Sequence, residues 1–286
     1  MTRSQIHIIK ASGLKTTFSE QKLRNSLEQS GATETQIESV IREVSGMLHD
    51  GISTKKIYRK AYEILRKSSY SQAARYKLKN AIMELGPSGY PFEKYIGAIL
   101  EEQGFETNVS VETPGRCVTH EIDVVARKNR KVVLVECKFH NRPGVKCDVK
   151  IPLYIHSRFR DVVKVEAQND HNQYDEYEGW IVTNTRFTED ALQYGNCSGM
   201  VMIGWDYPRK TSLKHRIGLS GLHPLTCLGS LNRREKDFLL QKGVVLCRHI
   251  MKRRDLLGEL GLSVSRIDKV LGECNELVHM LGVPAD

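Results

Sequence analysis

The sequence HEIDVVARKNRKVVLVECKFH, residues 120–140, contains two stretches rich in β-branched residues with a polar pair between them. Ile122–Arg127 and Lys131–Phe139 have the composition of strands, and Asn129-Arg130 has the composition of a turn. An antiparallel hairpin is the simplest arrangement of these pieces.

A turn centred on Asn129-Arg130 fixes the register of the hairpin and predicts three facing pairs: Lys128 with Lys131, Asp123 with Glu136, and Glu121 with Lys138. Side chains alternate between the two faces of a strand. The apolar face then carries Ile122, Val124, Ala126, Val133, Val135 and Cys137, and the other face carries Glu121, Asp123, Glu136 and Lys138. We expect the first face to be core and the second to carry the chemistry.

The facing carboxylates of Asp123 and Glu136 are the most informative pair. Like charges directly opposite each other destabilise a sheet unless a cation lies between them. A hard divalent ion with oxygen ligands, such as Mg²⁺, fits two carboxylates. The pattern therefore indicates metal-dependent cleavage of nucleic acid.

The spacing Asp-x12-Glu-x-Lys resembles the PD-(D/E)XK nuclease superfamily, and its flanks resemble the Mrr-like restriction endonucleases. The segment PFEKYIGAILEEQGF, residues 91–105, has the pattern of an amphipathic helix with an early glutamate. The segment GWIVTNTRFTEDALQYG, residues 179–195, fits the strand and helix that complete the sheet in that family. The resemblance implies an α/β restriction-endonuclease-like core with a mixed central sheet.

The residue types and the resemblance assign roles within this site. Asp123 and Glu136, helped by the backbone carbonyl of Cys137, would hold Mg²⁺ or Mn²⁺. Lys138 would orient the attacking water or stabilise developing charge, and Glu93 would be an outer carboxylate. The alternative is that Glu136 and Lys138 are a solvated strand end and that Glu93 is an ordinary helix-surface acid. His120 and His140 flank the strands and are left outside the metal ligands.

The whole composition is that of an ordinary globular chain. Its 286 residues are 40% hydrophobic, which is enough for two or three domains. The seven cysteines form no CxxC pair, which argues against a structural zinc site, and no eighteen-residue apolar run is present. Lys and Arg exceed Asp and Glu by 43 to 34, for a net charge of +9. This excess suits a phosphate-bearing partner, and many proteins without a nucleic-acid partner are equally basic. We expect a soluble, cytoplasmic protein with reduced thiols.

The first 85 residues have the pattern of a small hairpin followed by a helical cluster. Residues 6–18 predict two strands with a turn at Ser12-Gly13. Helical spacing then predicts helices over about 19–30, 33–49, 54–68 and 70–85. The expected N-caps are Ser19, Thr33 (with Gln36 as its capping-box partner) and Ser53 or Thr54.

The ordered motifs IIKxxG, F-x-x-x-K-L, DGISTKKI and AARY in this region resemble the ATP-cone, a regulatory nucleotide-binding module. The resemblance implies an α+β domain over 1–87 that binds ATP or dATP through Lys10, Thr16, Lys22 and Thr54. The alternative is that the lysines are solvated and that Thr54 only caps its helix. The sequence contains no GxxxxGK[ST] loop, so we expect nucleotide sensing rather than hydrolysis.

The remaining boundaries place the nuclease domain at 88–215 and a small helical domain at 216–286. The linker candidates are residues 86–91 and a basic stretch from about Pro208 to Pro224. The C-terminal helices faintly resemble helix-hairpin-helix DNA-binding units. Their two basic clusters could contact phosphates: Arg233, Arg234 and Lys236, and Lys252, Arg253 and Arg254. A helical bundle for docking or oligomerisation is an equal alternative.

Together these patterns predict a Mg²⁺-dependent DNA endonuclease that is regulated by ATP or dATP, with a role in restriction or anti-phage defence. Its partners would be DNA, an adenine nucleotide and a second copy of the chain, with no membrane. The alternative is a non-catalytic, nucleotide-responsive DNA-binding regulator on a nuclease scaffold. We do not expect a radical enzyme related to ribonucleotide reductase, because residue 85 is followed by the Glu-x-Lys hairpin and not by a barrel-sized domain.

Overall fold

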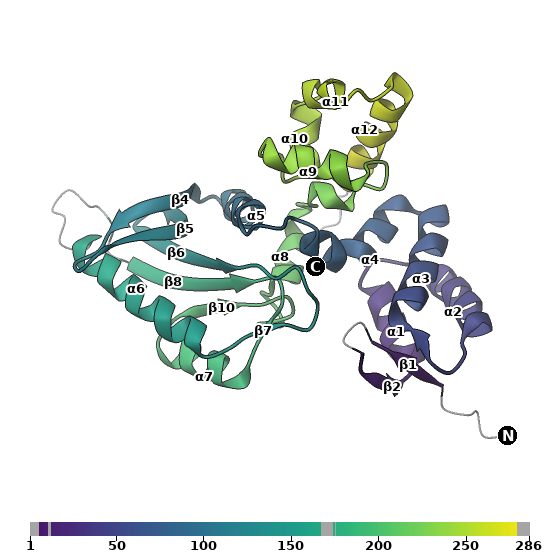
Figure 1. The fold of residues 1–286 in the computed structure, drawn as a ribbon, viewed down its shortest axis with the longest axis horizontal. Helices are drawn as coiled ribbons and strands as arrows, with labels where there is room; N and C mark the ends of the chain where they lie inside the picture. Colours follow the sequence, from purple (N-terminus) through teal and green to yellow (C-terminus); the bar gives the residue numbers. More distant parts are fainter. Residues whose placement is uncertain (1–5, 11–12, 167–173, 175, 279–286) are drawn as a thin grey trace.

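The chain folds into three connected parts that follow one another in sequence (Figure 1). The structure is a computed structural model, and it describes residues 6–10, 13–166, 174 and 176–278. An α+β unit comes first, a mixed sheet covered by helices follows, and a cluster of short helices comes last. This is the predicted fold class. Within the described residues, no helix is long and apolar enough to cross a membrane.

The N-terminal part has a three-stranded sheet and four helices. Its elements are β1 (His7–Ile9), β2 (Lys15–Thr17), α1 (Glu20–Glu28), α2 (Glu34–Met47), β3 (Ile52–Ser53), α3 (Thr54–Ser68) and α4 (Tyr70–Met83). β1 pairs antiparallel with β2, as predicted, while Ser12 of the expected turn lies outside the described residues. β3 was not predicted from the sequence, and it adds two residues parallel to β1.

The N-caps of this part form where the sequence predicts them. Ser19 caps α1, Ser53 caps α3, and Thr33 forms a capping box with Gln36 at the start of α2. Each cap accepts a hydrogen bond from a backbone N–H that the helix itself cannot satisfy. Apolar residues of these helices and of β1 and β3 then close a compact core around Leu27, Val40 and Leu65.

The central part is a five-stranded mixed sheet in the order β10-β8-β6-β5-β4. Its elements are α5 (Tyr90–Glu102), β4 (Glu106–Pro114), β5 (Thr119–Lys128), β6 (Lys131–Lys138), β7 (Lys146–Cys147), α6 (Lys150–Glu166), β8 (Glu176–Thr183), β9 (Arg186–Phe187), α7 (Glu189–Cys197), β10 (Val201–Ile203) and α8 (Leu213–Ser220). β4, β5 and β6 are antiparallel neighbours, and β6, β8 and β10 run parallel. The predicted turn forms at Asn129, whose φ of 54° is left-handed.

Both faces of the hairpin are buried, which corrects the prediction of one core face and one chemical face. Val124, Ala126, Val133 and Val135 pack on the side of α5. Val125, Val132 and Leu134 pack with Ile155 and Phe159 of α6 on the other side. A sheet with helices on both faces has apolar residues on both sides of its inner strands.

Ile122 departs from the predicted face for a local reason. It packs with Val125 and the α6 cluster rather than with Val124. β4 and β5 pair through Val109–Val124 and Val111–Ile122, with Ser110 at a left-handed φ of 54° between them. The pleat is therefore irregular at this position, and simple alternation fails there.

The C-terminal part is helical, as predicted. It contains η1 (Leu225–Cys227), α9 (Arg233–Gln241), α10 (Cys247–Lys252), α11 (Asp255–Glu259) and α12 (Val264–Val278). Two expectations change. The proposed linker 208–224 contains α8, with buried Leu213 and Ile217, and the expected boundary at 215/216 falls inside this helix. Lys236 is buried and donates to the carbonyl oxygen of Thr226 at 2.9 Å, so it is not available to a phosphate.

One apolar core joins the three parts. It includes Leu78 and Ile82 of α4, residues of α5 and the sheet, and Leu239 and Leu277 of the C-terminal helices. Polar contacts supplement this core where α4 of the N-terminal part packs against the C-terminal helices. Glu273 of α12, which is 7% exposed, accepts from the Tyr70 hydroxyl at 2.9 Å. The parts are therefore packed together rather than strung on free linkers.

Candidate functional site

The β5–β6 hairpin opens into a fork at Asp123 and Glu136. The ladder follows the predicted register from Lys128–Lys131 as far as Val124–Val135 and stops there. Beyond that point β5 continues along β4 and β6 continues along β8, so the predicted pairs Asp123–Glu136 and Glu121–Lys138 are not formed as ladder pairs. The Cys137 N–H donates to Asp123 Oδ2 at 2.7 Å instead. The Asp123 side chain therefore takes the place of a ladder hydrogen bond between the two carboxylate-bearing strands.

Glu136 is the most buried acid of the fork, at 3% exposure. Its Oε1 accepts a short charged hydrogen bond from Lys138 Nζ. Its Oε2 accepts from Arg158 Nη1 of α6 at 2.7 Å. Two cations thus neutralise one buried carboxylate, which is how buried charge is tolerated.

Asp123 has no such cation directly against it. Burial raises the pKa of Asp123 to about 7, and the nearby carboxylates of Glu136 and Glu93 add to the rise. Its Oδ1 accepts no hydrogen bond from the part of the chain that the structure describes. A partly buried carboxylate with a free oxygen and acidic neighbours would be stabilised in its charged form by a bound cation.

Glu93 lies near the fork but is turned toward β4. Its Oε2 accepts from the Ser110 hydroxyl at 3.2 Å. Burial raises its pKa, and Glu121 and Glu136 contribute to the rise. Among the described residues, no three His, Cys, Asp or Glu side chains lie close enough to share one metal ion. A metal at this fork would therefore rest on two carboxylates, the Cys137 carbonyl and water, a ligand set that suits Mg²⁺.

The two flanking histidines have structural partners. His120 Nε2 lies 2.9 Å from Asp161 Oδ2, and Asp161 also accepts from the Cys117 N–H at 3.1 Å. The hydrogen bond from His120 lowers the pKa of Asp161 to about 2. His140 is held by Asn184, whose side chain both accepts from its N–H and donates to its carbonyl.

The predicted nucleotide residues surround one cavity of about 540 Å³ in the N-terminal part. This volume lies in the range of small-molecule sites. Lys10, Thr16, Lys22 and Thr54 all line it. Lys10 follows β1, Thr16 lies in β2, and Lys22 and Thr54 lie in the first turns of α1 and α3. The two helix N-termini add backbone N–H groups that suit an anion.

Aromatic rings form the apolar wall of this cavity. Tyr58 and Tyr76 stack with centroids 4.7 Å apart and planes 16° apart, and Phe18 lies at the end of β2. The Tyr58 hydroxyl donates to the Tyr76 carbonyl at 3.0 Å, which fixes the pair. Pro143, from the loop that follows β6, also lines the cavity. A cavity lined by both lysines and aromatic rings fits a phosphorylated aromatic base.

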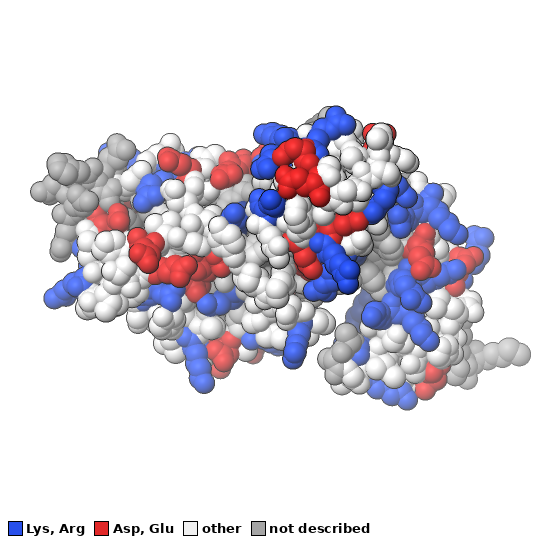
Figure 2. Space-filling model, turned by 45° about the horizontal axis from the view of Figure 1, so that its top comes forward, with Lys and Arg blue, Asp and Glu red and all other residues white. Residues whose placement is uncertain are grey.

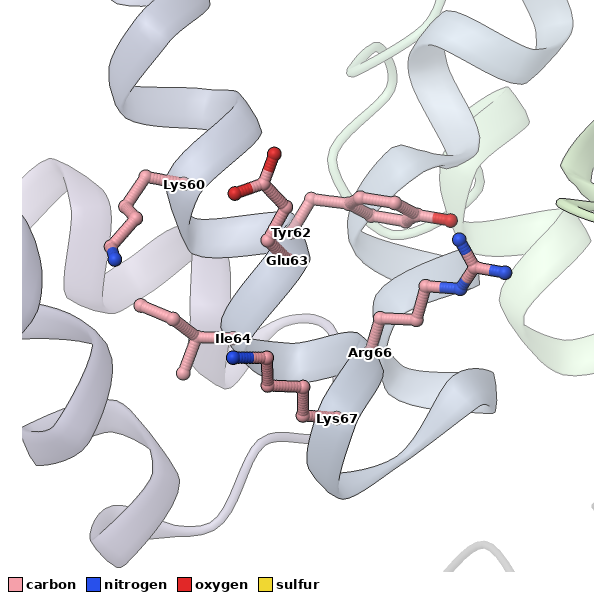
Figure 3. Close-up of a pocket in the computed structure, with 6 residues that line it drawn as sticks. All are labelled: Lys60, Tyr62, Glu63, Ile64, Arg66 and Lys67. Carbon is pink, nitrogen blue, oxygen red and sulfur yellow. The ribbon is translucent and has the colours of Figure 1, made fainter.

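A second hollow of about 450 Å³ on α3 contains none of these residues (Figure 3). In Figure 3, Tyr62 and Arg66 point toward the C-terminal helices, while Lys60, Ile64 and Lys67 point to the opposite side. Arg66 lies 3.8 Å from Glu273. All six residues that line this hollow belong to α3, and none of them is a predicted site residue.

Charge does not mark a DNA surface on the face drawn in Figure 2. Basic and acidic side chains are interspersed there over the described residues. The net charge of +9 therefore remains supporting information, as the sequence suggested.

Known families match consecutive parts of the chain. Residues 6–82 match the ATP cone domain, residues 86–206 match the restriction endonuclease domain of the Mrr type, and residues 223–278 match the AF1548-like C-terminal domain. An uncharacterized protein of Archaeoglobus fulgidus is 36% identical over 181 residues, which are 63% of this chain and 98% of that protein. The chain belongs to the AF1548-like family. A crystal structure of AF1548, described as a protein of unknown function, is similar with a TM-score of 0.55 and 35% identity, and the match covers 67% of this chain and 98% of that chain.

These matches confirm the predicted ATP-cone and Mrr-type restriction endonuclease domains. They also identify the C-terminal helices of this AF1548-like chain as a domain of its own family. Sequence reasoning missed three contributors to the two sites: Arg158, the Tyr58–Tyr76 stack and Pro143. The i,i+4 spacing of Tyr154 and Arg158 on α6 could have predicted that these two side chains contact each other. In the structure the guanidinium lies 4.8 Å from the ring centroid. Nothing local indicated that Arg158 faces Glu136.

Proposed function

We propose that this protein is a divalent-metal-dependent DNA endonuclease whose cleavage is controlled by an adenine nucleotide bound to the ATP-cone. The observation that carries the proposal is the fork. Asp123 stands there with a pKa raised to about 7, next to the Glu136–Lys138 ion pair, in an Mrr-type domain. A strongly shifted pKa of a carboxyl group, such as that of Asp123, is typical of a functional site.

Asp123, Glu136 and the Cys137 carbonyl would hold Mg²⁺ or Mn²⁺. When bound, the ion supplies positive charge at the scissile phosphate and acidifies a water. Lys138 orients the attacking water and stabilises charge on the phosphate. Arg158 of α6 donates a hydrogen bond to Glu136 and partly neutralises its negative charge. Glu93 would act as an outer carboxylate that influences Asp123 through its charge.

In the ATP-cone, Lys10 and Lys22 would contact the phosphates of ATP or dATP, and Thr16 and Thr54 would line the sugar and phosphate region. Their convergence on one cavity supports this assignment. A role in restriction or anti-phage defence, and nucleotide-dependent assembly of identical chains, belong to the same proposal. Control of cleavage or of assembly requires the nucleotide to bind two states of the protein with different affinity.

The nuclease assignment is tested with purified protein and supercoiled, linear, methylated and single-stranded DNA, with and without Mg²⁺. We expect the wild type to cut at least one substrate, and Asp123→Ala, Glu136→Ala and Lys138→Ala to lose cutting while still binding DNA. Glu112→Ala, an exposed acid on neighbouring β4, is the matched control. Equal cutting by all the variants would contradict the assignment.

A non-catalytic, nucleotide-responsive DNA-binding regulator is the second candidate. It is favoured by one observation, since both oxygens of Glu136 are already engaged by Lys138 and Arg158. In that case no substrate would be cut with any divalent ion, and DNA affinity alone would change with nucleotide.

A further inference from the structure

The nucleotide cavity of the ATP-cone includes one residue of the nuclease domain. Pro143 lines the cavity, and its other lining residues among the described part of the chain lie between Ile8 and Asn80. Pro143 belongs to the loop between β6 and β7, which begins directly after Lys138. We propose that this loop, residues 139–145, forms one wall of the nucleotide site, so that a bound nucleotide bridges the two domains. This inference rests on the proposed nucleotide binding and specifies how it reaches the nuclease centre.

The base of the loop is fixed to the end of the central sheet. The Thr183 hydroxyl donates to the Lys138 carbonyl at 2.7 Å. Asn184 holds His140 by two hydrogen bonds of 2.9 and 2.7 Å. Phe139 packs against Phe92 of α5 with ring centroids 5.6 Å apart. The base of the loop is therefore held next to the strand end that carries Lys138.

The tip of the loop has few contacts of its own. Residues 141–144 are exposed, and Gly144 adopts a left-handed φ of 89° with no neighbouring atom within 4 Å of an added Cβ. A segment with few buried contacts can change position at low cost. A ligand in the cavity can therefore change the position of the loop tip.

A nucleotide in the cavity would contact Pro143 together with Lys10, Lys22 and Thr54. It would favour the loop position that closes the site, because the proline ring buries apolar surface against the ligand. The loop begins directly after Lys138, so the loop position connects occupancy of the cavity to the strand end that carries Lys138. Because the position of the loop and the binding of the nucleotide are linked, a change in the loop that alters its preferred position must also change the affinity for the nucleotide.

The test uses the full chain in EDTA, with and without saturating ATP, and measures hydrogen–deuterium exchange of peptides covering residues 139–146. Binding is measured in parallel by calorimetry. We expect exchange of the loop amides to slow several-fold with ATP. Slowed exchange confined to residues 6–82, with binding heat observed, would overturn the inference and leave nucleotide binding intact. No binding heat in the wild type would overturn both.

A pair of variants gives a second readout. Pro143→Gly should weaken ATP binding about fivefold, the order expected for losing one apolar ring contact. Asn141→Gly introduces a glycine into the same loop at a residue that does not line the cavity, and its affinity should stay within twofold of the wild type. Equal affinities of Pro143→Gly and the wild type would contradict a wall formed by this loop.

Discussion

His223 gives a sharp test of how the central and C-terminal parts are joined. It lies between α8 and η1, is 5% exposed, and its Nδ1 lies 2.9 Å from the Gly221 carbonyl oxygen. Its own carbonyl accepts from the Cys247 N–H of α10 at 3.0 Å. Burial lowers the pKa of His223 to about 4, and Arg75 adds to the fall.

The sign of the pH effect follows from this shift. The unfolded chain has an ordinary histidine with a pKa near 6.5, so it binds more protons than the folded chain between pH 6.5 and 4. The stability associated with neutral His223 is complete above pH 6.5 and is lost as the pH falls toward 4. Between pH 7 and pH 5 the loss from this one group is about 2 kcal/mol.

The free energy of unfolding should be measured by urea denaturation at pH 7 and pH 5 for the wild type and His223→Asn. Asparagine can donate to the Gly221 carbonyl but does not titrate. Other groups contribute to the wild-type slope, including Asp123, whose raised pKa acts with the opposite sign. The difference between the two proteins isolates His223, and wild type should lose about 2 kcal/mol more than the variant. Equal losses would refute a buried neutral imidazole at this position.

Two further predictions concern buried acids. Asp123→Asn should make the metal-free protein about 4 kcal/mol more stable at pH 8, because it removes an acid with a pKa raised to about 7. Urea denaturation in EDTA checks this, and a destabilised variant would contradict it. Glu273→Ala should lower stability by about 2 kcal/mol, because it removes the acceptor of the Ser230 N–H and hydroxyl, whereas Gly229 and Tyr70 keep one partner each. Glu273→Gln, which keeps an acceptor, should lose clearly less, and equal urea midpoints for all three proteins would argue against this role.

Local patterns were enough to predict most of the secondary structure. The caps at Ser19, Thr33 and Ser53 and the turn at Asn129 depend on neighbours within a few residues, so the sequence carries them directly. β3 was missed because a strand of two residues has no periodicity to detect. Ile122 was placed on the wrong face because the pleat is irregular opposite Ser110, which alternation cannot foresee.

Only those residues of the candidate site that lie close together in the sequence could be predicted. Asp123, Glu136 and Lys138 belong to one hairpin, so their spacing alone brought them together. Arg158 comes from a helix packed across the sheet, and Pro143 reaches a cavity in another domain. Both contacts arise from packing between elements distant in sequence, and no local pattern contains that information.

The most direct test of the account is the rate of DNA cleavage as a function of ATP concentration at fixed Mg²⁺. We predict that the wild-type rate changes with a midpoint equal to the calorimetric dissociation constant, and that a Lys10→Ala, Lys22→Ala double variant shifts this midpoint to higher ATP. Glu136→Gln should show no cleavage at any ATP concentration. A wild-type rate independent of ATP, or an ATP response unchanged in the double variant, would contradict control of the Asp123–Glu136–Lys138 centre by the nucleotide cavity.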